Sequence, residues 1–174
     1  MFDDSNTKYL GGRSVLDFRV ICRAYSIGIS PSLPVYMGLG MTNRLKAEVW
    51  PEIPFDAWQE TCAALHLWCQ IVGKYRLKHS YWVNHSWHAT LYVTSRGLTT
   101  GPIPDPQVPV TVSFDFCDSL LLVEASGGQI AHFRLESMSV AEFRSRFDTA
   151  VRDVGGNCDI HFRPNELPDP IPFH

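Results

Sequence analysis

The segment from Ser139 to Gly156 constrains the fold most, because it has the full pattern of a capped amphipathic helix. Ser139 and Glu142 form a capping box, in which each side chain bonds to a backbone N–H group that the first turn leaves free. Gly155-Gly156 closes the helix. Apolar side chains recur at helical spacing: Val140, Phe143, Phe147, Val151 and Val154. This face is expected to lie in the core.

A second helix is predicted from about Phe55 to Gly73. Pro51 and Pro54 exclude a helix before it, since the residue preceding a proline is pushed out of the helical region, and Pro54 suits the first helical position. Apolar side chains cover both sides of this segment, so we expect it to be buried on both. Its one continuous polar line consists of Gln59, His66, Gln70 and Lys74.

Alternating apolar and polar residues predict strands at 85–94, 110–116 and 158–163, and the hairpin signal Ser126-Gly127-Gly128 predicts two more at 120–125 and 129–135. In the first of these, the alternation directs His85 and Trp87 to the core and His88 to the opposite, polar face. A Gly-, Thr- and Pro-rich loop is expected from Arg96 to Pro109. Short connections and this element order predict an α+β fold, with a mainly antiparallel sheet of about five strands and two helices packed against it.

Residues 1–48 differ from the rest and are expected to form a poorly structured extension, whereas 49–174 form a single α+β domain. The first forty residues contain no His and no Trp and end in a stretch rich in Gly, Pro and Ser. Two interpretations stay open: an extension of the native protein, or a translated start upstream of Met41 that plays no part in the fold.

Charge and cysteine usage narrow the classes of partner and the compartment. A formal net charge of -3 gives no global basic field, so non-specific binding of nucleic acid is not expected. No apolar run approaches the roughly 18 residues of a membrane span. The five cysteines are scattered and odd in number, and the N-terminus lacks the basic start of a signal peptide. These features favour reduced thiols and a cytoplasmic location.

Five blocks of the sequence carry a family resemblance: Trp50-Pro51-x-Ile53-Pro54, Leu65-His66-Leu67-Trp68-x-Gln70-Ile71-Val72-Gly73-Lys74, Asn84-His85-x-Trp87-His88, Tyr92-Val93-Thr94-x-Arg96-Gly97-Leu98-Thr99-Thr100 and Pro168-x-Pro170-Ile171-Pro172-Phe173. They resemble an uncharacterised bacterial family, domain of unknown function 5996, from about Val49 to the C-terminus. The resemblance implies the N-terminal half of the family's length and brings no known activity, cofactor or substrate. Cys69 stands where the family usually has Thr.

The polar residues of otherwise apolar segments predict a cleft for a small polar or anionic ligand. Lys74 and Arg96 would pair with its charge, and His66 or His88 could carry a proton. The predicted lining is His66, Gln70, Lys74, Asn84, His88 and Arg96. The alternative is a buried hydrogen-bond network or a solvent-facing line. No cofactor motif is present, and no metal is predicted, because Cys62 and Cys69 are better explained as small buried apolar side chains.

Two further hypotheses stay open. The helix that is apolar on both sides favours a non-catalytic interaction module, which completes its core against a partner, a second copy of the chain or a missing C-terminal half. The basic and aromatic residues between Tyr75 and Trp82 could instead contact single-stranded nucleic acid. We expect this less, since few cations give little phosphate-driven affinity.

Overall fold

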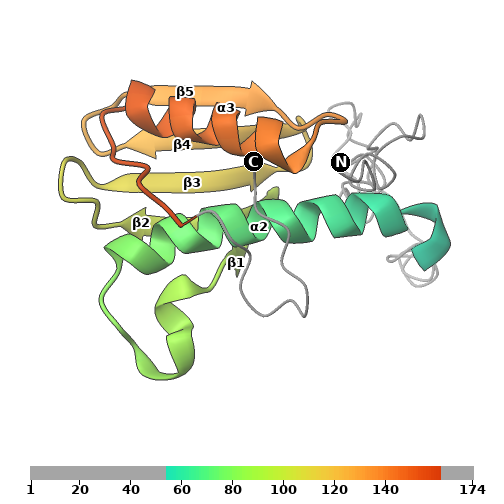
Figure 1. Cartoon of the computed structure of the whole chain (residues 1–174), viewed down its shortest axis with the longest axis horizontal. Coiled ribbons are helices and arrows are strands. Elements are labelled where there is room, and N and C mark those ends of the chain that lie inside the picture. The colour runs from blue at the N-terminus through green and yellow to red at the C-terminus, as the bar shows by residue number, and fades with distance from the viewer. Residues whose placement is uncertain (1–53, 162–174) are drawn as a thin grey trace, which may run out of the picture.

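The computed structural model describes residues 54–161, which form two layers, a five-stranded sheet with two long helices across one of its faces (Figure 1). The helices are α2 (Gln59–His79) and α3 (Val140–Asp153), and two short 3-10 helices are η2 (Phe55–Ala57) and η3 (Asn84–Ala89). The strands are β1 (Tyr92–Val93), β2 (Gly97–Ile103), β3 (Val110–Asp115), β4 (Leu120–Ala125) and β5 (Ile130–Arg134). The predicted α+β fold with an antiparallel sheet and two helices is confirmed.

The sheet is a simple antiparallel meander in which every strand pairs with its neighbour in the sequence, in the order β1-β2-β3-β4-β5. β3 and β4 are in register along their whole length, from Val110 opposite Ala125 to Asp115 opposite Leu120. Between Thr99 and Pro102 the register of β2 against β3 shifts, as in a β-bulge. All the pairings are therefore local in sequence.

Phe143 of α3 lies at the centre of the core and fixes the position of both helices. Its ring stacks on Trp68 of α2 with 4.8 Å between centroids, and it meets Phe133 of β5 at 5.5 Å and Phe114 of β3 at 6.3 Å. Of the predicted capping box, the Ser139 half is present, since its hydroxyl accepts a 3.0 Å hydrogen bond from the backbone N–H of Glu142, and the Glu142 carboxylate accepts from Arg146. The two helices therefore share one face of the sheet.

The strand predicted over 85–94 is wrong except at its end, where β1 lies. His85 and Ser86 have positive φ angles of 54° and 61°, and two successive left-handed residues cannot continue a pleated strand. The segment instead forms η3, which reverses the expected burial. Trp87, expected in the core, is 62% exposed, and His88, expected on the polar face, is buried.

Other boundaries differ in ways that the contacts explain. The predicted loop at 96–109 contains β2, whose Gly97 lies so close to Phe114 that a Cβ would overlap its carbonyl oxygen. α2 continues to His79. Residues 158–161 form no strand, although Cys158 and Ile160 remain buried and their neighbours exposed. The predictions for 1–48 and for the chain beyond 161 lie outside the described residues.

Candidate functional site

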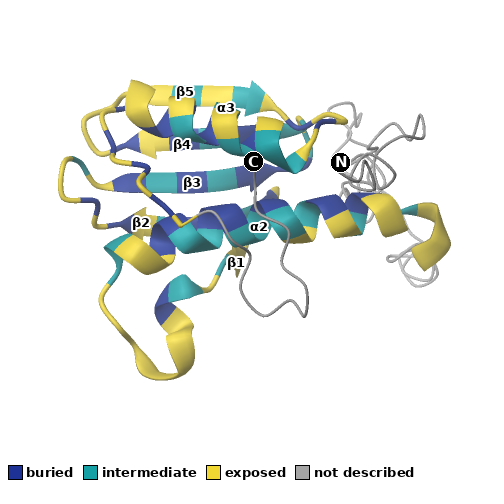
Figure 2. Ribbon diagram, in the orientation of Figure 1, coloured by how far each residue is buried: buried dark blue, intermediate teal, exposed yellow. Residues whose placement is uncertain are grey.

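Exposed apolar side chains are concentrated on one projection of the molecule, residues 80–93, here called the aromatic arm. It leaves the C-terminal end of α2, extends away from the sheet and returns through β1, and Figure 2 shows it as mostly exposed. Tyr81 is 87% exposed and Trp82 71% exposed. The arm holds six of the nine exposed large apolar side chains in residues 54–161: Tyr81, Trp82, Val83, Trp87, Tyr92 and Val93.

The sequence around the arm is free of formal charge. Residues 79–95 contain no Asp, Glu, Lys or Arg, in a chain that is 19% charged. A loop that faces only water normally carries charged side chains, because they cost nothing to solvate. The combination of exposed aromatic rings with the absence of charge is instead typical of the centre of a binding surface.

The two ends of the arm are attached to the last turns of α2. Arg76 is buried, and its guanidinium donates to the carbonyl oxygen of Thr90 and lies 5.1 Å from the ring centre of Tyr92. Lys78, just before the arm, donates to the carboxylate of Asp159 at 2.6 Å. Both cations at the base of the arm are therefore engaged with protein groups.

His88 contacts two other residues of the arm, Val83 and Trp82. Its Nδ1 accepts a hydrogen bond from the backbone N–H of Val83 at 3.2 Å, so the proton of the neutral ring is on Nε2. The ring also packs on Trp82 at 5.2 Å between centroids. The left-handed pair His85 and Ser86 turns the chain between these contacts. Two successive non-glycine residues in the left-handed conformation cost free energy, so the contacts around them must stabilise this turn.

A buried polar cluster around Asp105 lies at the base of the arm. The Tyr75 hydroxyl donates to the Asp105 carboxylate at 2.7 Å, and His79 Nε2 lies 3.8 Å from the same carboxylate and 3.0 Å from the carbonyl oxygen of Asn157. Asp105 also accepts from the backbone N–H groups of Asn157 at 2.8 Å and Gln107 at 2.9 Å. Both oxygens of this carboxylate therefore accept hydrogen bonds, and the cluster joins three segments of the chain.

The groups around Asp105 lower its pKa. Burial alone would raise it, but the hydrogen bonds from Asn157, Gln107 and Tyr75, together with the nearby His79, outweigh burial and lower the pKa. Asp105 therefore stays ionised, and its charge fixes the last turn of α2 against the loop that follows β2.

The six residues predicted to line a cleft lie in three different settings. His66 is exposed on α2, with its Nε2 3.3 Å from Nε2 of Gln70. Lys74, further along α2, is half-buried, and burial lowers its pKa. Asn84 and His88 belong to the arm. These positions bring His66 together with Gln70.

Arg96 belongs neither to α2 nor to the arm and lies at the turn between β1 and β2. Its guanidinium bonds to the carboxylates of Asp115 and Asp118, both at 2.6 Å. Asp115 in turn accepts from the backbone N–H groups of Cys117 and Asp118. Arg96 is thus a bridge between two turns of the sheet. The single cleft that we predicted is not visible in the contacts of these residues, and the ligand site stays a prediction.

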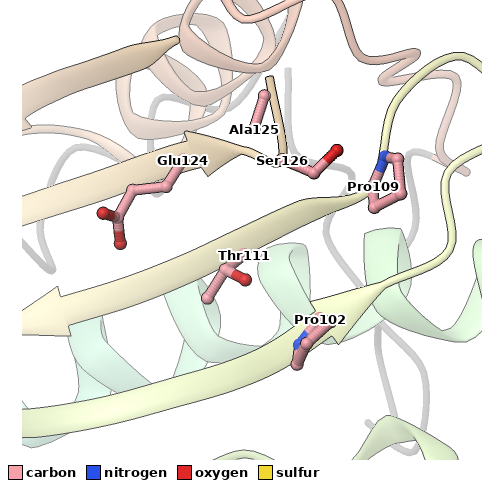
Figure 3. Close-up of a pocket in the computed structure, with 6 residues that line it drawn as sticks. All are labelled: Pro102, Pro109, Thr111, Glu124, Ala125 and Ser126. Carbon is pink, nitrogen blue, oxygen red and sulfur yellow. The ribbon is translucent and has the colours of Figure 1, made fainter. Parts of the chain in front are cut away.

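A shallow pocket lies on the face of the sheet opposite the helices (Figure 3). Its lining comes from β2, β3 and β4 and their connections: Pro102, Pro109, Thr111, Glu124, Ala125 and Ser126. None of the six predicted residues is among them. Its polar side chains are the Glu124 carboxylate and the hydroxyls of Thr111 and Ser126, and it contains no cation and no imidazole.

The part of the chain from 54 to 161 holds no group of three or more His, Cys, Asp or Glu side chains placed to bind a metal ion. No helix in this part is long and apolar enough to cross a membrane. Cys62, Cys69 and Cys158 are free thiols.

Sequence reasoning missed the arm for an identifiable reason. The signal was present as the uncharged interval between Lys78 and Arg96, rich in Tyr and Trp. The alternation within it favoured a strand and placed Trp87 in the core. Asp105 gave no such signal, because it lies thirty residues from Tyr75 in the sequence, between two prolines.

Comparison with known protein families matches most of the chain. A family model described as "Family of unknown function (DUF5996)" matches residues 50–174, which include the arm and the whole described fold. No curated protein matches the chain, and no solved structure does.

Proposed function

The chain belongs to DUF5996, a family of unknown function, and we propose that this domain is a non-catalytic interaction module that binds a protein partner through the aromatic arm. One observation carries the proposal: two Trp and two Tyr side chains at least half exposed on one charge-free projection of the fold. Trp and Tyr dominate the residues that contribute most binding free energy in protein interfaces, and charged residues are depleted at interface centres.

The condition of the neighbouring cations favours a protein partner over nucleic acid. Single-stranded nucleic acid needs cations that follow the phosphates beside the stacking aromatic rings. Arg76 is buried against Thr90 and Tyr92, and Lys78 is paired with Asp159. His79 is buried beside Asp105. The basic side chains between Tyr75 and Trp82 are thus engaged within the protein, and the aromatic rings are the groups that face outward.

The test compares an arm variant with a control of matched exposure. Tyr81→Ser with Trp87→Ser removes two exposed rings and keeps the contact between Trp82 and His88. Ile130→Ser removes an exposed apolar side chain of β5, away from the arm. Circular dichroism and thermal unfolding should show both variants folded like the wild type, because exposed positions contribute little to stability.

Affinity capture from cells that express the protein then provides the measurement. A partner retained by the wild type and by Ile130→Ser, and lost by the arm variant, is the expected result. Loss of two central aromatic residues typically weakens binding by about 2 kcal/mol or more, roughly thirtyfold in affinity. Equal recovery of every partner by the folded arm variant and the wild type would contradict the proposal.

A further inference from the structure

We propose that the ligand of the aromatic arm is an extended, proline-rich peptide, and that residues 164–173 of this chain occupy the arm. The inference rests on the proposed function and names the chemistry of the ligand. The segment contains Pro164, Pro168, Pro170 and Pro172, and lies outside the described residues.

The chemistry of the two segments is complementary. Proline-rich peptides are largely preformed in the extended polyproline conformation, so they lose little entropy on binding, and they dock on exposed aromatic side chains. Their backbone carbonyls have no internal partners, and an exposed indole N–H can donate to them. The arm offers Trp82 and Trp87 exposed, without formal charge. Within residues 164–173 the charges are Glu166 and Asp169, and the last part, 170–173, carries no Asp, Glu, Lys or Arg.

The path of the chain brings the two segments within reach. The described chain ends at His161, two residues after Asp159, whose carboxylate lies 2.6 Å from Nζ of Lys78 at the base of the arm. Asn157 contacts His79, the last residue of α2. At about 3.1 Å per residue, the thirteen residues from 162 to 174 extend over roughly 40 Å. Eight residues from Ser80 to Trp87 span at most about 28 Å.

Occupancy of the arm by its own chain would also compete with an external partner. A tethered ligand has a high effective concentration, so an intramolecular contact of modest strength can reduce partner binding severalfold. The proposal thus predicts that the module is partly self-inhibited.

Photo-crosslinking in the full chain tests where the segment docks. Phe173 is replaced by p-benzoylphenylalanine, a similarly shaped aromatic residue that bonds to nearby C–H groups on irradiation. Monomeric protein crosslinked between position 173 and residues 80–93 is the expected product, identified by mass spectrometry. The same replacement at Phe55, which is 55% exposed at the far end of α2, is the control and should give no crosslink to the arm.

A second variant, Pro168→Ala with Pro170→Ala and Pro172→Ala, tests the chemistry. Hydroxyl-radical oxidation of Trp87 should rise about fivefold, the factor that about 1 kcal/mol of lost contact corresponds to. Unchanged oxidation, crosslinks to any other region or no crosslink overturns the inference, as does a crosslink only between two copies. If partner capture still depends on Tyr81 and Trp87 in that case, the proposed function stands with a different ligand. Crosslinks to the arm without a captured partner would support docking of residues 164–173 on the arm and count against binding of an external protein partner.

Discussion

The hydroxyl of Tyr75 donates a 2.7 Å hydrogen bond to the carboxylate of Asp105, thirty residues further along the chain. The same carboxylate oxygen accepts the backbone N–H of Asn157, which follows α3. A single ionised group therefore joins three segments at the base of the aromatic arm. The contribution of this hydrogen bond to stability can be measured by replacing either Tyr75 or Asp105.

Replacing Tyr75 by Phe should lower the free energy of unfolding by about 1.5–3 kcal/mol, the usual worth of a hydrogen bond to a charged group. The ring remains to pack against Phe147 and His79. Urea denaturation measures the change, and Tyr92→Phe, at a half-exposed position, should leave the midpoint nearly unchanged. Equal stability of the wild type and Tyr75→Phe would show that the bond contributes nothing.

Asp105→Asn should change how stability depends on pH. The folded-state pKa of Asp105 is lowered, so the carboxylate stabilises the fold above its unfolded pKa of about 3.9 and loses that contribution as pH falls through the folded value. We expect the variant to be about 2 kcal/mol or more less stable at pH 7, and the difference to shrink below about pH 4. Unfolding measured from pH 7 to pH 2.5 tests this.

The control for this experiment is Asp153→Asn, an exposed position at the end of α3. Its unfolding curves should follow those of the wild type across the range. A constant difference between Asp105→Asn and the wild type at every pH would contradict the assigned role of the charge.

His88→Ala should loosen the arm without unfolding the domain. The substitution removes the acceptor of the Val83 N–H and the surface on which Trp82 packs. Hydrogen exchange of the Val83 amide should accelerate about fivefold or more, since about 1 kcal/mol of local stability is lost. His132→Ala, an exposed position on β5, should leave that amide unaffected. The role of His88 would be refuted by identical exchange of Val83 in the two variants.

The thiols of Cys69 and Cys158 should resist alkylation. Burial raises the pKa of each to about 12, with the Asp148 carboxylate adding to the effect at Cys158. At pH 8 only about one molecule in ten thousand carries the reactive thiolate at either position. Peptide mapping after iodoacetamide treatment of the folded protein, compared with urea-unfolded protein, measures protection. Rapid modification of Cys69 in the folded state would show that α2 is less well packed than described.

The parts of the fold that local patterns determine were predicted from the sequence. The cap at Ser139 and the strand at 120–125 depend on contacts with near neighbours, and both appear as expected. The structures of the arm and of β2 were not predicted, because they depend on contacts that local patterns do not contain. Gly97 is required by a close approach to Phe114 that no local pattern contains, and the left-handed pair at His85 and Ser86 is stabilised by packing.

The candidate site shows the same division. Asn84 and His88, predicted to line a ligand cleft, lie in the arm, and their role in binding a ligand stays a prediction. Polarity alone led to His66 and Arg96, whose partners are a neighbouring amide and two aspartates. Exposure decides which aromatic rings face a partner, and exposure of Trp87 depends on a backbone turn that hydrophobic alternation does not encode.

Arg76 and the cluster around Asp105 hold the arm in place, and these residues are different from the exposed rings that we propose bind a partner. The residues that hold the arm in place belong to α2 and to the connecting loops, while exposed positions such as Tyr81 and Trp87 contribute little to the core. Substitutions at those tips can therefore alter what is recognised at little cost in stability.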